Sequence, residues 1–182
     1  MAKSVALIIG SLRKDSINRK LGKALEKLAE GRLSFNELHI GDLPHYNEEL
    51  WDNLPDPVAR LKDRVEHSDA VLAITPEYNR SYPGVIKNAF DWASRPYGAN
   101  SWAAKPAAVT GTSPGAIGAA VAQARLKSDM LNLGMIVMAQ PEAYIQWKPD
   151  AVAADGSISD ESLRKFLGGF VTAFEEFIAK HG

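Results

Sequence analysis

Four short apolar runs, separated by segments with helical periodicity, limit what this chain can fold into. The runs read SVALII (residues 4–9), DAVLAIT (69–75), KPAAVTG (105–111) and MIVMA (135–139). Nearly continuous apolar runs of this length are typical of strands that are covered on both faces. Such strands belong to parallel sheets, whose crossover connections place helices on both sides.

Helical segments alternate with these strands. In the first segment, apolar residues recur at spacings of four, four and three (Ile17, Leu21, Leu25 and Leu28), and Gly31 stands where a C-cap glycine belongs. Two later segments carry a proline, Pro57 or Pro83, where the first helical turn has no need of the missing N–H group. The predicted helices cover residues 17–30, 56–68, 83–95, 119–134 and 159–180.

These elements predict an α/β fold in a single domain that spans residues 1–182. Residues 32–40 alternate apolar and polar side chains, which adds a strand nearer an edge of the sheet. We therefore expect a flavodoxin-like three-layer fold with a five-stranded parallel sheet in the order 2-1-3-4-5. The segments 41–57 and 140–157 are expected to be irregular.

Composition excludes several classes of function. The chain has 21 basic and 22 acidic residues, so its net charge of −1 provides no overall field for binding nucleic acid or a membrane surface. It has no cysteine, which excludes disulfides and dithiol redox chemistry and fits a cytoplasmic protein. The apolar start is too short to span a membrane. The four histidines have no metal-ligand spacing, so no metal site is expected.

In a sheet of this order, ligands bind beyond the carboxyl ends of the strands where the strand order reverses. The first loop at that place, GSLRKDSINR, matches neither the dinucleotide fingerprint nor the triphosphate-binding loop. It offers the hydroxyls of Ser11 and Ser16, the guanidinium of Arg13, the amide of Asn18 and the free N–H groups of a helix start. This set suits one phosphate monoester. The alternative is that Ser16 only caps the helix and Arg13 is solvated.

Two further loops reach the same edge. In TPEYNRSYPG, an asparagine that tolerates left-handed geometry and a Pro-Gly turn can present backbone groups to a flat heterocycle, which Tyr78 or Tyr82 would cover. An ordinary turn with exposed aromatic residues is the alternative. The third loop, TSPGAIG, has such small side chains that a flat ligand can approach its backbone, although a plain glycine turn would look the same.

Together, the stretches GSLRKDSINR, PEYNRSYPGVIKNAFDW and KPAAVTGTSPGAIG resemble the NAD(P)H-dependent FMN reductase family, most closely its bacterial chromate and quinone reductases. The resemblance implies bound FMN, NADH or NADPH as hydride donor, and small-molecule acceptors such as quinones, flavins or chromate. It also implies a homo-oligomer, a dimer or a tetramer. The implied cofactor-binding residues are Ser11, Arg13, Ser16 and Asn18 for the phosphate, Pro76, Glu77, Tyr78 and Asn79 for the ring, and Ser81, Ser113 and Gly115 for further contacts.

With FMN bound, the chemistry belongs to the cofactor, so we assign no catalytic acid or base. Glu77 is expected to orient backbone groups or to pair with Arg80. Phe90, Trp92, Tyr97 and Trp102 fall close together, which favours a subunit interface because aromatic residues concentrate there. A non-enzymatic electron carrier and a flavin-binding redox sensor remain alternatives, and the sequence does not choose between NADH and NADPH.

Overall fold

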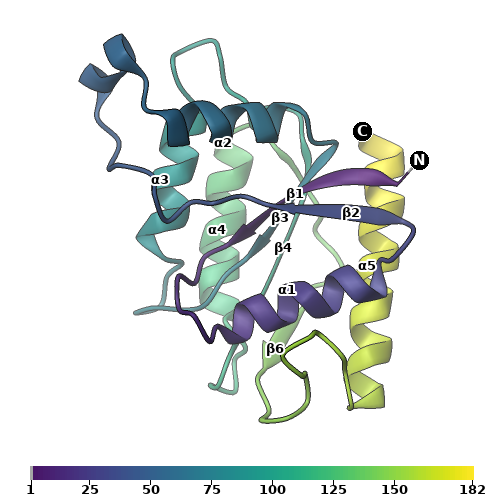
Figure 1. Cartoon of the computed structure of the whole chain (residues 1–182). Coiled ribbons are helices and arrows are strands. Elements are labelled where there is room, and N and C mark those ends of the chain that lie inside the picture. Colours follow the sequence, from purple (N-terminus) through teal and green to yellow (C-terminus); the bar gives the residue numbers. More distant parts are fainter. Residues whose placement is uncertain (1) are drawn as a thin grey trace.

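The computed structural model describes residues 2–182 and contains a parallel sheet between two helical layers (Figure 1). The strands are β1 (Lys3–Ile9), β2 (Leu33–Glu37), β3 (Ala70–Ile74), β4 (Pro106–Ser113), β5 (Ile136–Val137) and β6 (Tyr144–Gln146). The helices are α1 (Ile17–Leu28), α2 (Asp56–Glu66), α3 (Gly84–Ala93), α4 (Ala120–Asn132) and α5 (Glu161–His181), with a 3-10 helix, η1, at Glu48–Asn53.

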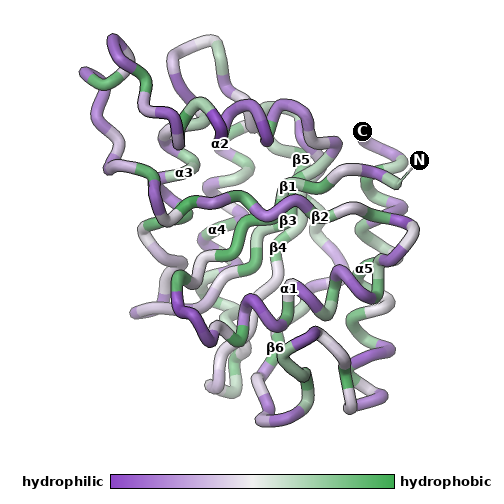
Figure 2. The backbone as a smooth tube through the Cα atoms, in the orientation of Figure 1, coloured by the Kyte–Doolittle hydropathy of each residue, from purple (hydrophilic) through white to green (hydrophobic). Residues whose placement is uncertain are grey.

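The strand order is β2-β1-β3-β4-β5, and every pairing is parallel, which confirms the predicted flavodoxin-like arrangement. The apolar side chains of alternate strand residues enter two separate clusters. One cluster lies beneath α1 and α5, and the other beneath α2, α3 and α4. In Figure 2, β1 and β3 are coloured as hydrophobic along most of their length. The continuous apolar runs are thus explained by burial on both faces.

The C-terminal half of the sheet differs from the prediction in three respects. The fifth strand has only two residues, and β4 extends to Ser113, two residues into the predicted third loop. A sixth strand, β6, lies in the segment predicted to be irregular and pairs with Gly111–Ser113 of β4. β4 therefore changes neighbours along its length, from β5 at its start to β6 at its end.

The aromatic residues proposed for an interface lie mostly in the core, so that part of the interpretation was wrong. Phe90, Trp92 and Trp102 are at most 1% exposed. Trp92 packs edge-on against Tyr46 and Trp51, because the long segment between β2 and α2 folds back over α3. Only Tyr97, at 96% exposure, remains available for an interface.

Candidate cofactor site

The three loops predicted to meet at the carboxyl edge of the sheet do meet there. They enclose a pocket of about 240 Å³. The predicted residues that line it are Ser11, Arg13, Ser16, Asn18, Pro76, Glu77, Tyr78 and Ser113. Asn79, Ser81 and Gly115 belong to the same loops but do not line the pocket. Three segments that are distant in the sequence thus contribute to one site.

The start of α1 forms one wall of the pocket. Ser16 caps this helix: its Oγ accepts a hydrogen bond from Arg19 N–H at 3.2 Å. The capping role considered for Ser16 in the sequence analysis is therefore present. Among residues 2–182, no acceptor is found for the N–H groups of Ile17 and Asn18, the first two of the helix. Ser11 is buried beside them and Arg13 is exposed at the rim. Unpaired N–H groups, hydroxyls and a guanidinium are the donor set that a phosphate monoester requires.

Asn18 joins two of the loops. Its side chain is buried and exchanges two hydrogen bonds with the backbone of Thr112, Nδ2 donating to the carbonyl at 3.1 Å and Oδ1 accepting from the N–H at 3.0 Å. The amide therefore attaches the first turn of α1 to the end of β4. Thr112 lines the pocket but was not predicted, because a contact across 94 residues leaves no local pattern in one sequence.

The second loop is a tight turn. Tyr78 and Ser81 exchange two backbone hydrogen bonds, at 2.9 and 3.0 Å, and the two residues between them, Asn79 and Arg80, have left-handed φ angles of 50° and 63°. Left-handed geometry costs energy in any residue except glycine, and persists where surrounding contacts enforce it. Tyr78 is 47% exposed at the tip. Asn79 thus adopts the left-handed geometry that the sequence analysis expected it to tolerate.

Glu77 is engaged within the protein. Its carboxylate, only 8% exposed, accepts hydrogen bonds from Val121 and Ala122 N–H at 3.1 and 3.2 Å and pairs with Arg80 at 3.0 Å. Residue Ala119, at the N-cap of α4, provides no side-chain cap. Glu77 therefore caps α4 from another segment, and both roles predicted for it, orienting backbone groups and pairing with Arg80, are confirmed. This leaves it poorly suited to act as a general base.

Two glycines allow the segments beneath the pocket to approach one another. A Cβ atom on Gly111 would lie 2.1 Å from the carbonyl oxygen of Thr75, at the end of β3. A Cβ atom on Gly118 would lie 2.5 Å from the backbone nitrogen of Ile145 in β6. Any side chain at either position would push two strands or a loop apart. The small residues in and before the third loop thus allow close backbone packing, in addition to leaving room for a flat ligand.

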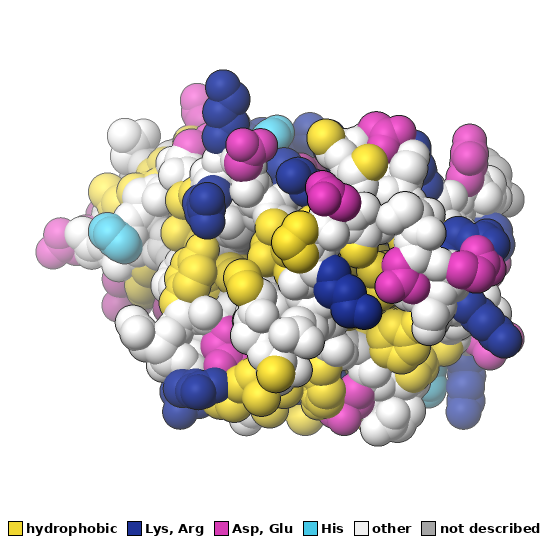
Figure 3. All heavy atoms as spheres, turned by 90° about the horizontal axis from the view of Figure 1, so that it is seen from below, with side chains coloured by type: hydrophobic (Ala, Val, Ile, Leu, Met, Phe, Trp, Pro, Cys, Tyr) yellow, Lys and Arg dark blue, Asp and Glu magenta, His cyan; other side chains and the backbone are white. Residues whose placement is uncertain are grey.

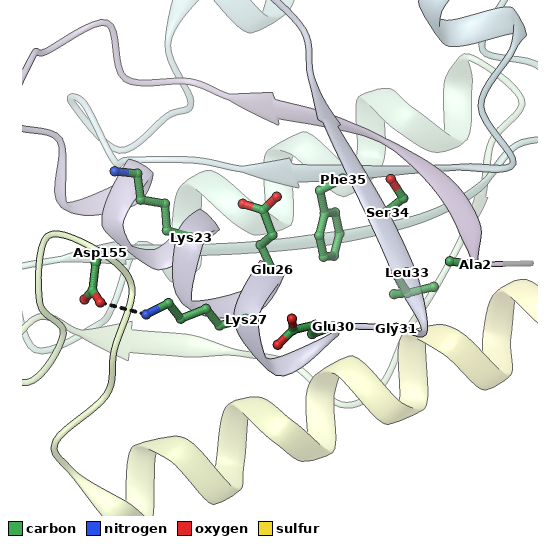
Figure 4. Close-up of a pocket in the computed structure, with 10 residues that line it drawn as sticks. All are labelled: Ala2, Lys23, Glu26, Lys27, Glu30, Gly31, Leu33, Ser34, Phe35 and Asp155. Atoms are coloured by element: carbon green, nitrogen blue, oxygen red, sulfur yellow. Dashed lines mark hydrogen bonds and ion pairs between the residues drawn. The ribbon is translucent and has the colours of Figure 1, made fainter.

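A larger cavity, about 750 Å³, lies elsewhere, between α1, β2 and the loop that precedes α5 (Figure 4). Its lining includes Lys23, Glu26, Lys27, Glu30 and Asp155, and a Lys27–Asp155 ion pair of 2.7 Å crosses one end. The charged side chains there are two lysines and three carboxylates, so the cavity has no excess of positive charge for a phosphate. None of the predicted site residues lines it. Its size alone therefore does not make it the functional site.

Exposed apolar side chains occur on all three loops that enclose the 240 Å³ pocket, called the cofactor pocket below. Leu12, Tyr78 and Ile117, one from each loop, are between 43% and 56% exposed. Figure 3, which views the molecule from below, shows hydrophobic side chains grouped across the middle of that face, among scattered charges of both signs. An apolar rim around a polar base suits a ligand that has a phosphate at one end and a flat ring at the other.

Two further findings concern the described residues. No helix within residues 2–182 combines the length and the hydropathy that a membrane crossing requires. In the same part of the chain, no three His, Cys, Asp or Glu residues are grouped so that they could hold a metal ion.

Comparison with known proteins defines the class. The family model described as NADPH-dependent FMN reductase matches residues 4–149, and the chain belongs to this family. It is therefore an oxidoreductase, with FMN and a nicotinamide hydride donor as its cofactors.

Individual relatives agree with this class. The chain is 43% identical over 178 residues to a 2-hydroxy-1,4-benzoquinone reductase of Burkholderia sp, covering 98% of this chain and 97% of the relative. It is 44% identical over 176 residues to a quinone reductase of Pseudomonas putida, covering 96% and 94%. Among solved structures, the flavoenzyme NAD(P)H:(acceptor) oxidoreductase FerB from Paracoccus denitrificans is 70% identical, covers 100% of both chains and superposes with a TM-score of 0.98.

Proposed function

We propose that this chain is an NAD(P)H-dependent quinone reductase that binds FMN at the carboxyl edge of its sheet. Flavins and oxidised metal anions such as chromate are further acceptors that an open flavin face would reduce. The observation that carries the proposal is the start of α1, where two unpaired N–H groups adjoin Ser11, Arg13 and Ser16 in one pocket. The names of the relatives support quinones as acceptors.

The pocket fits FMN at both ends. The phosphate would lie at the N-terminus of α1, where the helix dipole and the N–H groups of Ile17 and Asn18 favour a dianion. The ring would lie along the second loop, against Pro76, Glu77, Tyr78 and Asn79. Ser81, Ser113 and Gly115 would add contacts from the second and third loops. Asn18 also fixes the relative position of the first and third loops, whichever atoms of FMN it contacts.

Bound FMN would supply the two-electron chemistry, accepting hydride from the nicotinamide and passing electrons to the acceptor. The residues of the chain would bind and orient the FMN. Glu77 has its carboxylate occupied by α4 and Arg80, so it holds the second loop in place and moves no proton. The tight turn at Tyr78–Ser81 keeps its backbone groups in fixed directions toward the ring edge.

The proposed partners are small electron acceptors, without nucleic acid or membrane, since the net charge is near zero. A homo-oligomer remains part of the proposal, supported by Tyr97, whose almost complete exposure is unusual for an aromatic side chain. A cytoplasmic location is proposed from the cysteine-free sequence.

The proposal is tested by titrating the apoprotein with FMN and with riboflavin, followed by steady-state assays with NADH, NADPH and a benzoquinone. We expect tight FMN binding, at least about tenfold weaker binding of riboflavin because the phosphate contacts are lost, and quinone-dependent oxidation of a nicotinamide. Equal affinity for the two flavins would contradict the phosphate site. A yellow protein that oxidises neither nicotinamide would instead be an electron carrier or a sensor.

A further inference from the structure

The second loop is attached to α4 at two points, one on each side of its tight turn. Glu77 precedes the turn and accepts hydrogen bonds from Val121 and Ala122 N–H. Tyr82 follows the turn, and its hydroxyl donates a hydrogen bond to the carboxylate of Asp129. Val121 and Asp129 are eight residues apart, so the two attachments are separated by about 12 Å along the helix axis.

Two separated attachments fix an orientation, whereas one attachment leaves the loop free to pivot. The turn between the two attachments contains Asn79 and Arg80, which both adopt left-handed conformations that cost energy in residues other than glycine. The ring of Tyr82 is half-buried and packs against the apolar cluster beneath α3 and α4. Burial together with the nearby carboxylates of Asp129 and Asp91 raises the pKa of Tyr82, so its hydroxyl remains protonated and able to donate.

We propose that Tyr82 and Asp129 are positioning residues for the flavin: their hydrogen bond is the second attachment that fixes the angle of the Tyr78–Ser81 turn against the ring. Neither residue lines the cofactor pocket. Their effect on the cofactor passes through the turn, and the proposal rests on the proposed FMN site.

The experiment compares five variants as apoproteins titrated with FMN: Tyr82→Phe, Asp129→Leu, the double variant of these two, Asp129→Asn and Asn100→Ala. The first two remove the hydrogen bond, while Asp129→Asn keeps an oxygen that can accept it. Asn100→Ala is the control, because Asn100 donates to the carbonyl of Leu133, the C-cap of α4, from a loop outside the pocket, and also accepts from Trp102 N–H.

We expect Tyr82→Phe and Asp129→Leu each to weaken FMN binding by about three- to tenfold and to shift the flavin midpoint potential. The double variant should be no worse than either single variant, and Asp129→Asn should restore most of the affinity. Asn100→Ala should lower the melting temperature of the apoprotein without changing FMN affinity or potential.

The proposal is overturned if Tyr82→Phe and Asp129→Leu lower only the melting temperature, as the control does, and bind FMN with wild-type affinity and potential. If Tyr82→Phe fails to fold, Asp129→Leu decides the question alone. Wild-type apoprotein that takes up no FMN would overturn the proposed cofactor site, and this proposal with it.

Discussion

Helices α1 and α4 begin at the same edge of the sheet, each after a central strand, yet their first turns are completed in opposite ways. In α1, the N–H groups of Ile17 and Asn18 have no acceptor among residues 2–182. In α4, which begins at Ala120, the N–H groups of the second and third residues, Val121 and Ala122, are bound by the carboxylate of Glu77. Both helix starts attract an anion by the same physics. At the start of α4 that anion is the carboxylate of Glu77, whereas at the start of α1 we propose that it is the phosphate of FMN.

The helix dipole therefore does not by itself identify a phosphate site. The neighbouring side chains decide whether a helix start can bind an anion from outside the chain. Two hydroxyls, Arg13 and the exposed Asp15 line the pocket at the start of α1, whereas a buried carboxylate already accepts hydrogen bonds from the start of α4. Changing the group that accepts hydrogen bonds from either helix start should therefore change FMN affinity or stability.

The largest effect is expected when the start of α1 is made to resemble that of α4. Aspartate is a good N-cap, so Ser16→Asp should fold normally, but its charge would occupy the open N–H groups and repel the phosphate. We expect FMN affinity to fall by at least about 100-fold, measured by flavin fluorescence titration. Ser16→Asn, a neutral cap, is the control. Retention of wild-type FMN affinity in Ser16→Asp would show that the phosphate binds elsewhere.

A smaller effect is expected from the cation at the rim of the same site. Arg13→Gln removes a charged donor, and FMN affinity should fall by about tenfold, while riboflavin affinity should stay unchanged. Lys14→Gln removes the same charge one residue further along, outside the pocket lining, and serves as the control. Equal losses in the two variants would mean that only general electrostatic attraction is involved.

The converse change opens the start of α4. Glu77→Ala leaves the N–H groups of Val121 and Ala122 without their acceptor, and the free energy of unfolding of the apoprotein should fall by about 1–3 kcal/mol. Urea denaturation measures this loss. Glu77→Gln keeps one acceptor oxygen and should lose less. An unchanged free energy in Glu77→Ala would mean that water replaces the carboxylate without cost.

The smallest effect, on the free energy of unfolding, is expected at Asp69, a carboxylate that accepts a hydrogen bond from a backbone N–H group outside any helix start. Asp69 accepts from Ser4 N–H at 2.7 Å and from Lys3 Nζ at 3.1 Å, and these contacts, chiefly the first, lower its pKa. Because the folded-state pKa lies below the unfolded one, the stabilisation is complete above the unfolded value and is lost as the pH falls through the folded value.

Solvent screening limits this contribution, because the Asp69 side chain is 37% exposed. Asp69→Asn should reduce the free energy of unfolding by less than about 1 kcal/mol at neutral pH. The difference from wild type should shrink as the pH falls below about 4. Urea denaturation at neutral pH and near pH 3 checks this, and a difference that grows toward acid pH would reverse the assigned sign.

The sequence predicted what depends on local patterns. Continuous apolar runs identified β1, β3 and β4, because strands buried on both faces carry no polar alternation. Proline at a helix start predicted where α2 and α3 begin to within one residue, while both helices end two residues earlier than predicted. The three loops could be assigned to one pocket because parallel strands end at a common edge.

What the sequence could not predict depends on distant partners. The three residues of β6 form a strand only because the extension of β4 offers them a backbone edge. Trp92 is buried by a segment more than 40 positions away, whose proline carbonyl at Pro44 also accepts from its indole. Asn18 binds the backbone of Thr112, and Glu77 caps α4, which has no side-chain cap of its own. Both contacts join segments that lie far apart in the sequence.

The change of neighbours along β4 has a consequence for how the molecule behaves in a crowded solution. Its border beyond β4 consists of pieces two and three residues long, β5 and β6, which face different halves of the strand. An extended chain from another molecule needs a longer continuous row of backbone donors and acceptors to attach itself there. At this edge of the sheet, the interrupted border therefore disfavours the addition of a strand from another molecule.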